Sequence, residues 1–220
     1  MTDREEYIAY IQGRKSSAKR NYHKESLKCM EQIRASGEKP RILLHACCVV
    51  CACWPMELLA DTFDITLMYH NSNIWPQEEY DHRLAELKRY LKERWNDSIS
   101  LIVTPYDGTQ YMQDLAFGKD DPEGWKRCFW CYEKRMDECF RYADENGYDW
   151  FTTVMTFSRQ KDSQKLNEIG LKLQQKYTHT KYFCSDFKKA DGQVRSNAIC
   201  EEYNLYKQNY CGCIYSLRSE

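Results

Sequence analysis

Hydrophobic positions along the chain fall into short continuous runs that alternate with longer stretches of helical spacing. The runs that predict strands are 41–46, 64–70, 99–104 and 150–155. The stretches with helical spacing are 3–38, 55–62, 76–95, 109–117, 131–146, 162–177 and 195–208. Short runs without polar alternation are typical of strands that are covered on both faces. We therefore expect an α/β fold, with a Rossmann-like parallel sheet flanked by helices in a single domain.

The segment Gly37-Glu38-Lys39-Pro40 separates the first helical stretch from the first strand. We expect residues 1–40 to form a helical N-terminal extension and residues 41–220 to form the catalytic α/β domain. The extension contains a basic segment, Arg14 to Lys24, that has no acidic residue. This segment is either a solvated turn or an arm that contacts phosphate groups.

The overall charge is nearly balanced. The 220 residues include 32 Lys and Arg and 33 Asp and Glu, a net charge of -1. This balance excludes nucleic-acid binding through bulk charge, but it leaves room for a local basic patch. No apolar run approaches the about 20 residues of a membrane span. The charged N-terminus also lacks the apolar core of a signal peptide, so we expect a cytoplasmic protein with reduced thiols and no membrane partner.

Cysteine is unusually frequent for such a protein, with 12 residues in the chain. Four cysteines stand alone and are expected to pack as small hydrophobic residues: Cys29, Cys139, Cys184 and Cys200. The others are grouped in three short segments: Cys47, Cys48, Cys51 and Cys53; Cys128 and Cys131; Cys211 and Cys213. Grouped thiols in a reducing compartment indicate metal or redox chemistry.

The spacing of the grouped cysteines favours an iron–sulfur cluster over zinc. Cys48–Cys51 and Cys128–Cys131 are both CxxC pairs, and two such pairs can give four thiolates to zinc. The gap between the pairs far exceeds the about 15–20 residues of a zinc ribbon, whereas clusters tolerate long gaps. Cys211-Gly-Cys213 can close a small strained disulfide, which is typical of a labile redox couple. Two free thiols are the alternative.

Several short motifs follow one another in a fixed order after residue 41. They are Leu43-Leu44-His45-Ala46-Cys47-Cys48, Asn71-Ser72-Asn73-Ile74-Trp75-Pro76 with Glu79-Tyr80, Arg127-Cys128-Phe129-Trp130-Cys131-Tyr132-Glu133-Lys134-Arg135, Phe151-Thr152-Thr153, Asp186-Phe187-Lys188-Lys189, Arg195-Ser196, and Leu205-Tyr206-Lys207-Gln208 before Tyr210-Cys211-Gly212-Cys213. Together these motifs resemble the QueH family of epoxyqueuosine reductases over residues 41–215. The sequence departs from the family pattern at Val49-Val50, where Gly-Pro is usual, and at Ser158-Arg159, where Ser-Pro is usual.

The resemblance implies an enzyme that reduces epoxyqueuosine to queuosine at the wobble position of tRNA anticodons, the final step of queuosine biosynthesis. It also implies a fold akin to the adenine-nucleotide α-hydrolases and a four-iron four-sulfur (4Fe-4S) cluster. The implied cluster ligands are Cys47, Cys48, Cys128 and Cys131. Cys211 and Cys213 match the redox-active pair of the family, and a second iron would lie near Cys51. An external electron donor is required.

Further residues are candidates for proton transfer and for RNA binding. Asp186 and Tyr132 are the candidate proton donors to the leaving oxygen. Lys188, Lys189 and Arg195, together with the basic segment of the extension, are the candidate contacts to tRNA. The alternative function is a zinc-stabilised tRNA-binding module without catalysis. A nucleotide-activating tRNA thiolation enzyme is disfavoured, because the first strand leads into cysteines rather than a glycine-rich phosphate loop.

Overall fold

A five-stranded parallel sheet forms the centre of the protein. The computed structural model describes residues 3–16 and 19–217. The strands are β1 (Arg41–His45), β2 (Asp64–Tyr69), β3 (Ser100–Val103), β4 (Trp150–Thr153) and β5 (Lys181–Tyr182). Their order in the sheet is β3-β2-β1-β4-β5, and every neighbouring pair is parallel. The predicted α/β, Rossmann-like class is confirmed.

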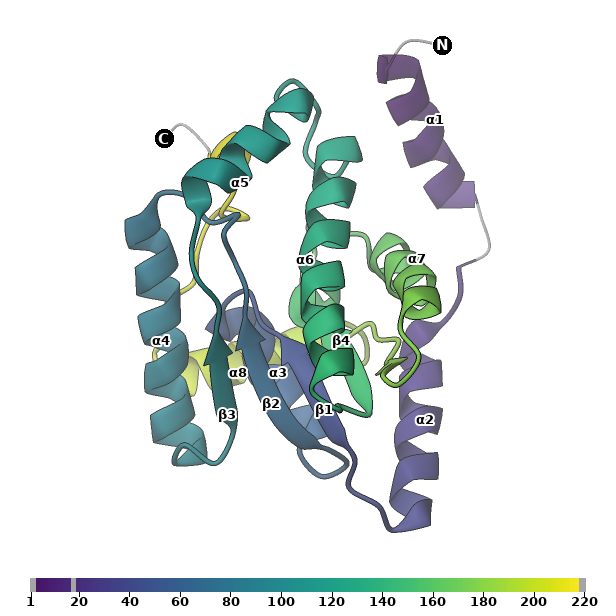
Figure 1. The fold of residues 1–220 in the computed structure, drawn as a ribbon, viewed down its shortest axis with the longest axis vertical. Helices are drawn as coiled ribbons and strands as arrows, with labels where there is room; N and C mark the ends of the chain where they lie inside the picture. Colours follow the sequence, from purple (N-terminus) through teal and green to yellow (C-terminus); the bar gives the residue numbers. More distant parts are fainter. Residues whose placement is uncertain (1–2, 17–18, 218–220) are drawn as a thin grey trace.

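Helices cover both faces of the sheet, as Figure 1 shows. The helices are α1 (Asp3–Ser16), α2 (Tyr22–Ser36), α3 (Val49–Leu59), α4 (Gln77–Trp95), α5 (Gly108–Leu115), α6 (Lys126–Glu145), α7 (Ser163–Leu173) and α8 (Gly192–Glu202). Helices α3, α4 and α8 pack on one face, and α6 and α7 pack on the other. None of the helices in the described part has both the length and the apolar character that crossing a bilayer requires.

The burial of strand β1 on both of its faces explains why its run of apolar residues is continuous. Ile42 and Leu44 are buried in the core under α3 and α4, whereas Leu43 is buried in the core under α6 and α7. Successive side chains of a strand point to opposite faces, so a strand covered on both faces needs an apolar residue at every position. His45, the last residue of the strand, is also completely buried, and it faces α6 rather than solvent.

The helical N-terminal extension is present, but it consists of two helices rather than one. Asn21 begins α2 by accepting the Lys24 N–H at 3.0 Å, and Gly37 ends it in the left-handed conformation at φ 73°. The interruption falls in the basic segment, where the side chains of residues 14–18 lie outside the described part. Helix α1 packs on the start of α6, with Tyr7 and Tyr10 against the Trp125 ring.

Helix boundaries differ from the prediction at the two cysteine segments. Helix α3 begins at Val49 and not near Pro55, and α6 begins at Lys126 and not at Cys131. In both segments, no glycine or proline stands between the first cysteine and the last one. Such a residue would hold the chain outside a helix there. Strand β5 was not predicted, because a strand of two residues has no recognisable period. Cys51 therefore lies in the first turn of α3 and Cys128 in the first turn of α6, whereas Cys47 and Cys48 precede α3.

Candidate metal and redox site

The candidate site lies at the carboxyl edge of the sheet, between β1 and β4. The chain order of the strands reverses there, since β1 has β2 on one side and β4 on the other. Ligands of open α/β sheets bind in the crevice outside this switch point. Cys47 and Cys48 follow β1 directly, and the segment that follows β4 brings Lys161 to the same edge.

Three thiols converge at this edge. The sulfur atoms of Cys47, Cys48 and Cys51 all lie within 4.8 Å of one another, and those of Cys47 and Cys48 are 3.9 Å apart. Cys48 is the extended residue that precedes α3, and Cys51 stands in the first turn of that helix, which returns its side chain to the pair. All three are buried. This three-thiol group is a soft donor set that could hold a metal.

The second pair of thiols comes from the start of α6. Cys128 accepts a hydrogen bond from the Gly124 main-chain N–H at 3.2 Å. The Tyr111 hydroxyl donates to the Cys131 sulfur at 3.5 Å. Within the described residues, neither sulfur belongs to the three-thiol group. The structure therefore brings Cys51 close to the two cysteines after β1, and the CxxC pair does not belong to this close group.

Cys211 links the three-thiol group and the CxxC pair. It lines a cavity of about 150 Å³ together with Cys47, Cys51 and Lys161, which we call the thiol cavity. A thiolate at Cys211 also acts electrostatically on Cys128, whose pKa is raised to about 11, chiefly by burial. The sulfur of Cys211 is thus within electrostatic range of both units.

Cys213 points away from the thiol cavity. Its side chain packs against the small cluster of Tyr111, Leu115 and Cys131. All the cysteines of the chain, Cys211 and Cys213 included, are free thiols in the structure. Burial raises the pKa of Cys213 to about 12. A disulfide between the two remains a prediction.

The segment that carries Cys211 is held by residues of the motifs noted in the sequence. Gly212 has φ 113°, a conformation that favours glycine, and its carbonyl accepts the Trp75 N–H at 2.7 Å. The buried Arg83 donates to the Cys211 carbonyl at 3.2 Å, while Glu79 holds the same guanidinium at 2.7 Å. The polar residues of α4 therefore position the last thiol segment.

The charge of the three thiols is shared. Hydrogen bonds from Cys48 and Cys51 hold the pKa of Cys47 well below its usual range. The same contact with Cys47 raises the pKa of Cys48 to about 12, and it also raises that of Cys51. One thiolate is therefore shared among three sulfurs. The Gln208 side-chain amide donates a further hydrogen bond to the Cys48 sulfur at 2.9 Å.

Two buried cations face these sulfurs without a carboxylate partner in the described part of the chain. Arg135 is 1% exposed and Lys161 is 9% exposed. Burial works to lower the pKa of Lys161, but the electrostatic effect of the nearby sulfurs, those of Cys211, Cys47 and Cys51, outweighs it and raises the pKa. Since a buried charge needs an opposite charge, these cations match an anionic thiolate centre. The donor set and its surroundings fit a thiolate-bound metal group.

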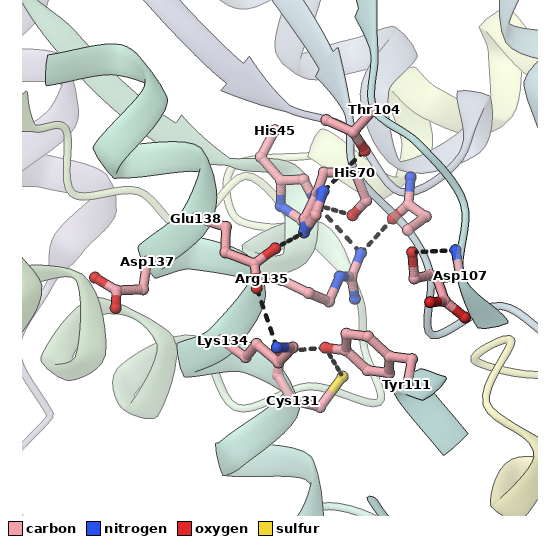
Figure 2. A network of polar contacts seen from close by, with 12 residues as sticks. His45, His70, Thr104, Asp107, Tyr111, Cys131, Lys134, Arg135, Asp137 and Glu138 are labelled. Carbon is pink, nitrogen blue, oxygen red and sulfur yellow. Dashed lines mark hydrogen bonds and ion pairs between the residues drawn. The ribbon is translucent and has the colours of Figure 1, made fainter. Parts of the chain in front are cut away.

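A polar network beside Cys131 holds Arg135 in place, as Figure 2 shows. The Arg135 guanidinium donates to the Asn71 side-chain oxygen, and it lies 3.2 Å from the His45 ring nitrogen Nε2. Burial and the Arg135 charge hold the pKa of His45 well below its usual range, so the ring is neutral. His70 pairs with Glu138 and lies 2.8 Å from the Thr104 hydroxyl oxygen. Helix α6 is thereby tied to the ends of β1 and β2.

The candidate proton donors occupy different places. Tyr132 is buried near Cys128 and Cys211, and burial raises its pKa well above the usual range. Asp186 is also buried, but it pairs with Lys188 at 2.7 Å and accepts the Ser163 hydroxyl at 2.9 Å. It lines a neighbouring cavity and not the thiol cavity. Tyr132 is therefore the candidate nearer the sulfurs.

The candidate RNA contacts are also divided. Lys188 and Lys189 line one cavity with residues 19–24 of the extension. Arg195 is exposed on α8 and does not line this cavity.

Sequence reasoning missed Lys161 and the contacts of Tyr111 and Gln208 to sulfur. The position of Lys161 was an available signal, because this residue follows a strand at the carboxyl edge of the sheet. The neighbouring residues, however, do not distinguish it from the other lysines of the chain.

A Rossmann-like sheet with clustered thiols at its carboxyl edge defines an α/β protein with a thiolate metal or redox centre. The family model described as epoxyqueuosine reductase QueH matches residues 42–219 of the chain. The chain belongs to this family of oxidoreductases. The family match begins after the N-terminal extension.

Curated relatives agree with this assignment, and each is named epoxyqueuosine reductase QueH. The relative from Streptococcus pyogenes serotype M1 is 36% identical over 198 residues, covering 87% of this chain and 77% of the relative. The Staphylococcus epidermidis relative is 36% identical over 212 residues, covering 94% and 88%. The Thermotoga maritima relative is 28% identical over 185 residues, covering 80% and 90%.

Proposed function

We propose that this protein reduces epoxyqueuosine to queuosine at the wobble position of tRNA anticodons, as the final step of queuosine biosynthesis. Its membership of the QueH family supports this reaction. The observation that carries the proposal is the three-thiol group, which shares its cavity with Cys211 at the switch point of the sheet. Clustered, buried thiols facing a redox-capable cysteine are what a two-electron reduction requires.

Converting an epoxide to an alkene takes two electrons and two protons, and the oxygen leaves as water. In the proposed reaction the thiols of Cys211 and Cys213 supply the two electrons and the two protons. They are oxidised to a disulfide as both carbon–oxygen bonds of the epoxide break. An external electron donor then reduces the disulfide back to two thiols. The position of Cys211 on the thiol cavity supports its role as the thiol nearer the substrate.

We assign a 4Fe-4S cluster to Cys47, Cys48, Cys128 and Cys131, and a second iron to Cys51. When bound, these groups would supply single-electron transfer and Lewis acidity toward the leaving oxygen. The buried thiols and the two cations without carboxylate partners support an anionic centre here. The Gln208 amide on the Cys48 sulfur fits the hydrogen bonding that tunes such centres.

Tyr132 is our first candidate for proton donation. Because burial raises the pKa of its hydroxyl well above the usual range, it keeps its proton at neutral pH and can pass it to a strongly basic alkoxide, after which a proton from the thiols restores the hydroxyl. Asp186 would act from the side of the neighbouring cavity, where Lys188 holds it as an ion pair. Tyr132→Phe is therefore expected to slow reduction more than Asp186→Asn.

We propose tRNA as the partner, with contacts at Lys188, Lys189 and Arg195. Local clusters of basic residues must provide the attraction to RNA, since the net charge of the chain is only -1. We place the reaction in the cytoplasm, where thiols are kept reduced.

Anaerobic purification followed by metal, sulfide and product analysis tests the proposal. We expect iron and sulfide in the protein, and conversion of epoxyqueuosine to queuosine in tRNA that is followed by mass spectrometry. A colourless, zinc-only protein that remains fully active would contradict the cluster. Zinc without any epoxide reduction would instead favour the zinc-stabilised tRNA-binding module.

Cys51→Ser separates the two groups of ligands. We expect this variant to lose the second iron and to keep the cluster spectrum, because the proposed cluster ligands are unchanged. Cys139→Ser is the control, since Cys139 is buried in the core under α6 and α7. Loss of all iron from Cys51→Ser would show that the three-thiol group itself carries the cluster.

A further inference from the structure

Residues 19–24 of the N-terminal extension line the same cavity as Lys188 and Lys189. This cavity has a volume of about 440 Å³. Residues 19–24 form one wall, and residues 186–190 form the opposite wall, with Arg159 and Lys161 also lining it. We call this cavity the basic groove. Its two walls are far apart in the sequence, and hydrogen bonds between Arg20 and Gln164 of α7 hold the first wall in place.

Most of the charge in the basic groove is positive and unpaired. Seven Lys and Arg side chains line it against two Asp. Arg20 pairs with Glu25, and Lys188 pairs with Asp186. The side-chain cations of Lys19, Lys24, Arg159 and Lys189 have no ion pair within residues 3–16 and 19–217. A groove with several unpaired cations favours a ligand with repeated negative charges.

The wall contributed by the extension is held in a fixed position. The main-chain N–H of Arg20 donates to the Gln164 side-chain oxygen at 3.2 Å, and the Gln164 amide donates back to the Arg20 carbonyl at 2.9 Å. The Arg20 guanidinium also lies over the Tyr22 ring at 5.1 Å. This two-way amide contact with α7 makes the segment part of the groove rather than a loose arm.

The basic groove leads to the thiol cavity through Lys161. This side chain is 9% exposed, lines both cavities, and has no hydrogen bond or ion pair from its ammonium in the part of the chain that the structure describes. The two cavities therefore adjoin at Lys161, and a ligand in the groove lies beside the cavity that Cys47, Cys51 and Cys211 line. This adjacency favours a polyanion of which a neighbouring unit reacts at the sulfurs.

We propose that the basic groove binds the sugar–phosphate backbone of the tRNA next to the reacting nucleotide, with residues 19–24 and 186–190 as its two walls. This inference rests on the proposed function, and it gives the N-terminal extension the role of completing the RNA site. A backbone of regularly spaced phosphates satisfies the unpaired cations on both walls, which one free phosphate does not do. Phosphate contacts position the RNA without reading its sequence.

The test is the double variant Lys24→Ala/Lys189→Ala, which removes one unpaired cation from each wall. The matched control is Lys28→Ala/Lys92→Ala, because both lysines are exposed and neither lines the groove. Binding of an anticodon stem-loop and of full-length tRNA is measured over a series of KCl concentrations. Melting temperatures of all variants check that the fold is unchanged.

We expect the groove variant to bind tRNA about 5-fold more weakly at low salt, from two phosphate contacts of modest strength. Its slope of log affinity against log salt should flatten by about 0.7 to 1 for each lysine. The control should keep the wild-type slope. An unchanged slope in the groove variant, or an equal change in the control, would overturn the inference.

Reductase activity separates this inference from the proposed function. At tRNA concentrations below saturation, we expect the groove variant to reduce epoxyqueuosine about 5-fold more slowly, in line with its weaker binding, and the control Lys28→Ala/Lys92→Ala to keep the wild-type rate. If the wild-type protein never reduces epoxyqueuosine but its tRNA binding still depends on both lysines, the proposed function fails and the groove assignment stands. An active wild type with unaffected binding in the groove variant rejects the groove alone.

Discussion

The guanidinium of Arg135 lies 3.2 Å from the Nε2 nitrogen of His45, a ring whose pKa is held well below its usual range. The same guanidinium donates to the side-chain oxygen of Asn71. A completely buried cation thus has only neutral partners in hydrogen-bonding contact among the described residues. Burial works to lower the pKa of Arg135, and the nearby sulfurs of Cys131 and Cys47 act electrostatically to raise it.

Arg135→Met should destabilise the protein by about 1–3 kcal/mol, because the Asn71 oxygen is left buried without a donor. The variant should also retain less metal, since the thiolates lose a neighbouring positive charge. Urea unfolding and metal analysis measure the two effects. Arg141→Met is the control from the same helix, where an exposed ion pair with Glu145 contributes little. Equal effects in both variants would contradict this role of Arg135.

Cys211→Ser should abolish reduction of epoxyqueuosine but leave the visible spectrum of the protein unchanged. Cys211 lines the thiol cavity but is proposed as a redox thiol and not as a ligand. Cys47→Ser should instead lose both activity and spectrum, because Cys47 belongs to the three-thiol group. Anaerobic absorption spectra and turnover assays distinguish the variants. Loss of the spectrum in Cys211→Ser would make Cys211 a ligand.

Gly212→Ala should reduce activity by more than its loss of folding stability alone would explain. The residue has φ 113°, and an added Cβ would lie 3.0 Å from Ile74 and 3.1 Å from Arg83. Such backbone strain costs about 1–3 kcal/mol, and the shift would displace Cys211. Gly37→Ala is the control, because Gly37 also has a positive φ but has nothing within 4 Å of an added Cβ. We expect both variants to unfold more easily and only Gly212→Ala to lose turnover.

Glu138 should make the stability of the protein depend on pH in the acid range. The hydrogen bond with His70, supported by Lys134, lowers the pKa of Glu138 from 4.5 to about 2. A lowered carboxyl pKa stabilises the folded state fully above the unfolded value, and this contribution disappears as the pH falls from about 4.5 toward 2. Glu138→Gln should therefore flatten the pH dependence of the unfolding free energy in this window.

Chemical denaturation at a series of pH values measures the effect of Glu138. Glu145→Gln is its control, because that carboxylate is exposed and pairs only with Arg141. The same slope in Glu138→Gln and in the wild type would show that the contact with His70 contributes nothing to stability.

Local patterns were enough to predict the longer elements. The apolar runs of β1, β2 and β4 and the helical spacing of α4 and α6 were recognisable, because burial on a repeating face leaves a period in the sequence. The cysteine segments carried their own chemical signal. Strand β5 and the early start of α3 were missed, since short elements and first helical turns depend on packing contacts that the sequence does not display.

The sequence by itself determined that this chain builds a parallel α/β sheet and places grouped thiols after its strands. Only the tertiary structure decided which groups meet. Strand order puts β1 beside β4, so that Cys47 and Lys161 share one edge. A helical turn brings Cys51 into the close group of Cys47 and Cys48, to which Cys128 and Cys131 do not belong. Residues far apart along a chain meet through packing, and packing leaves no period or spacing from which their distance can be read.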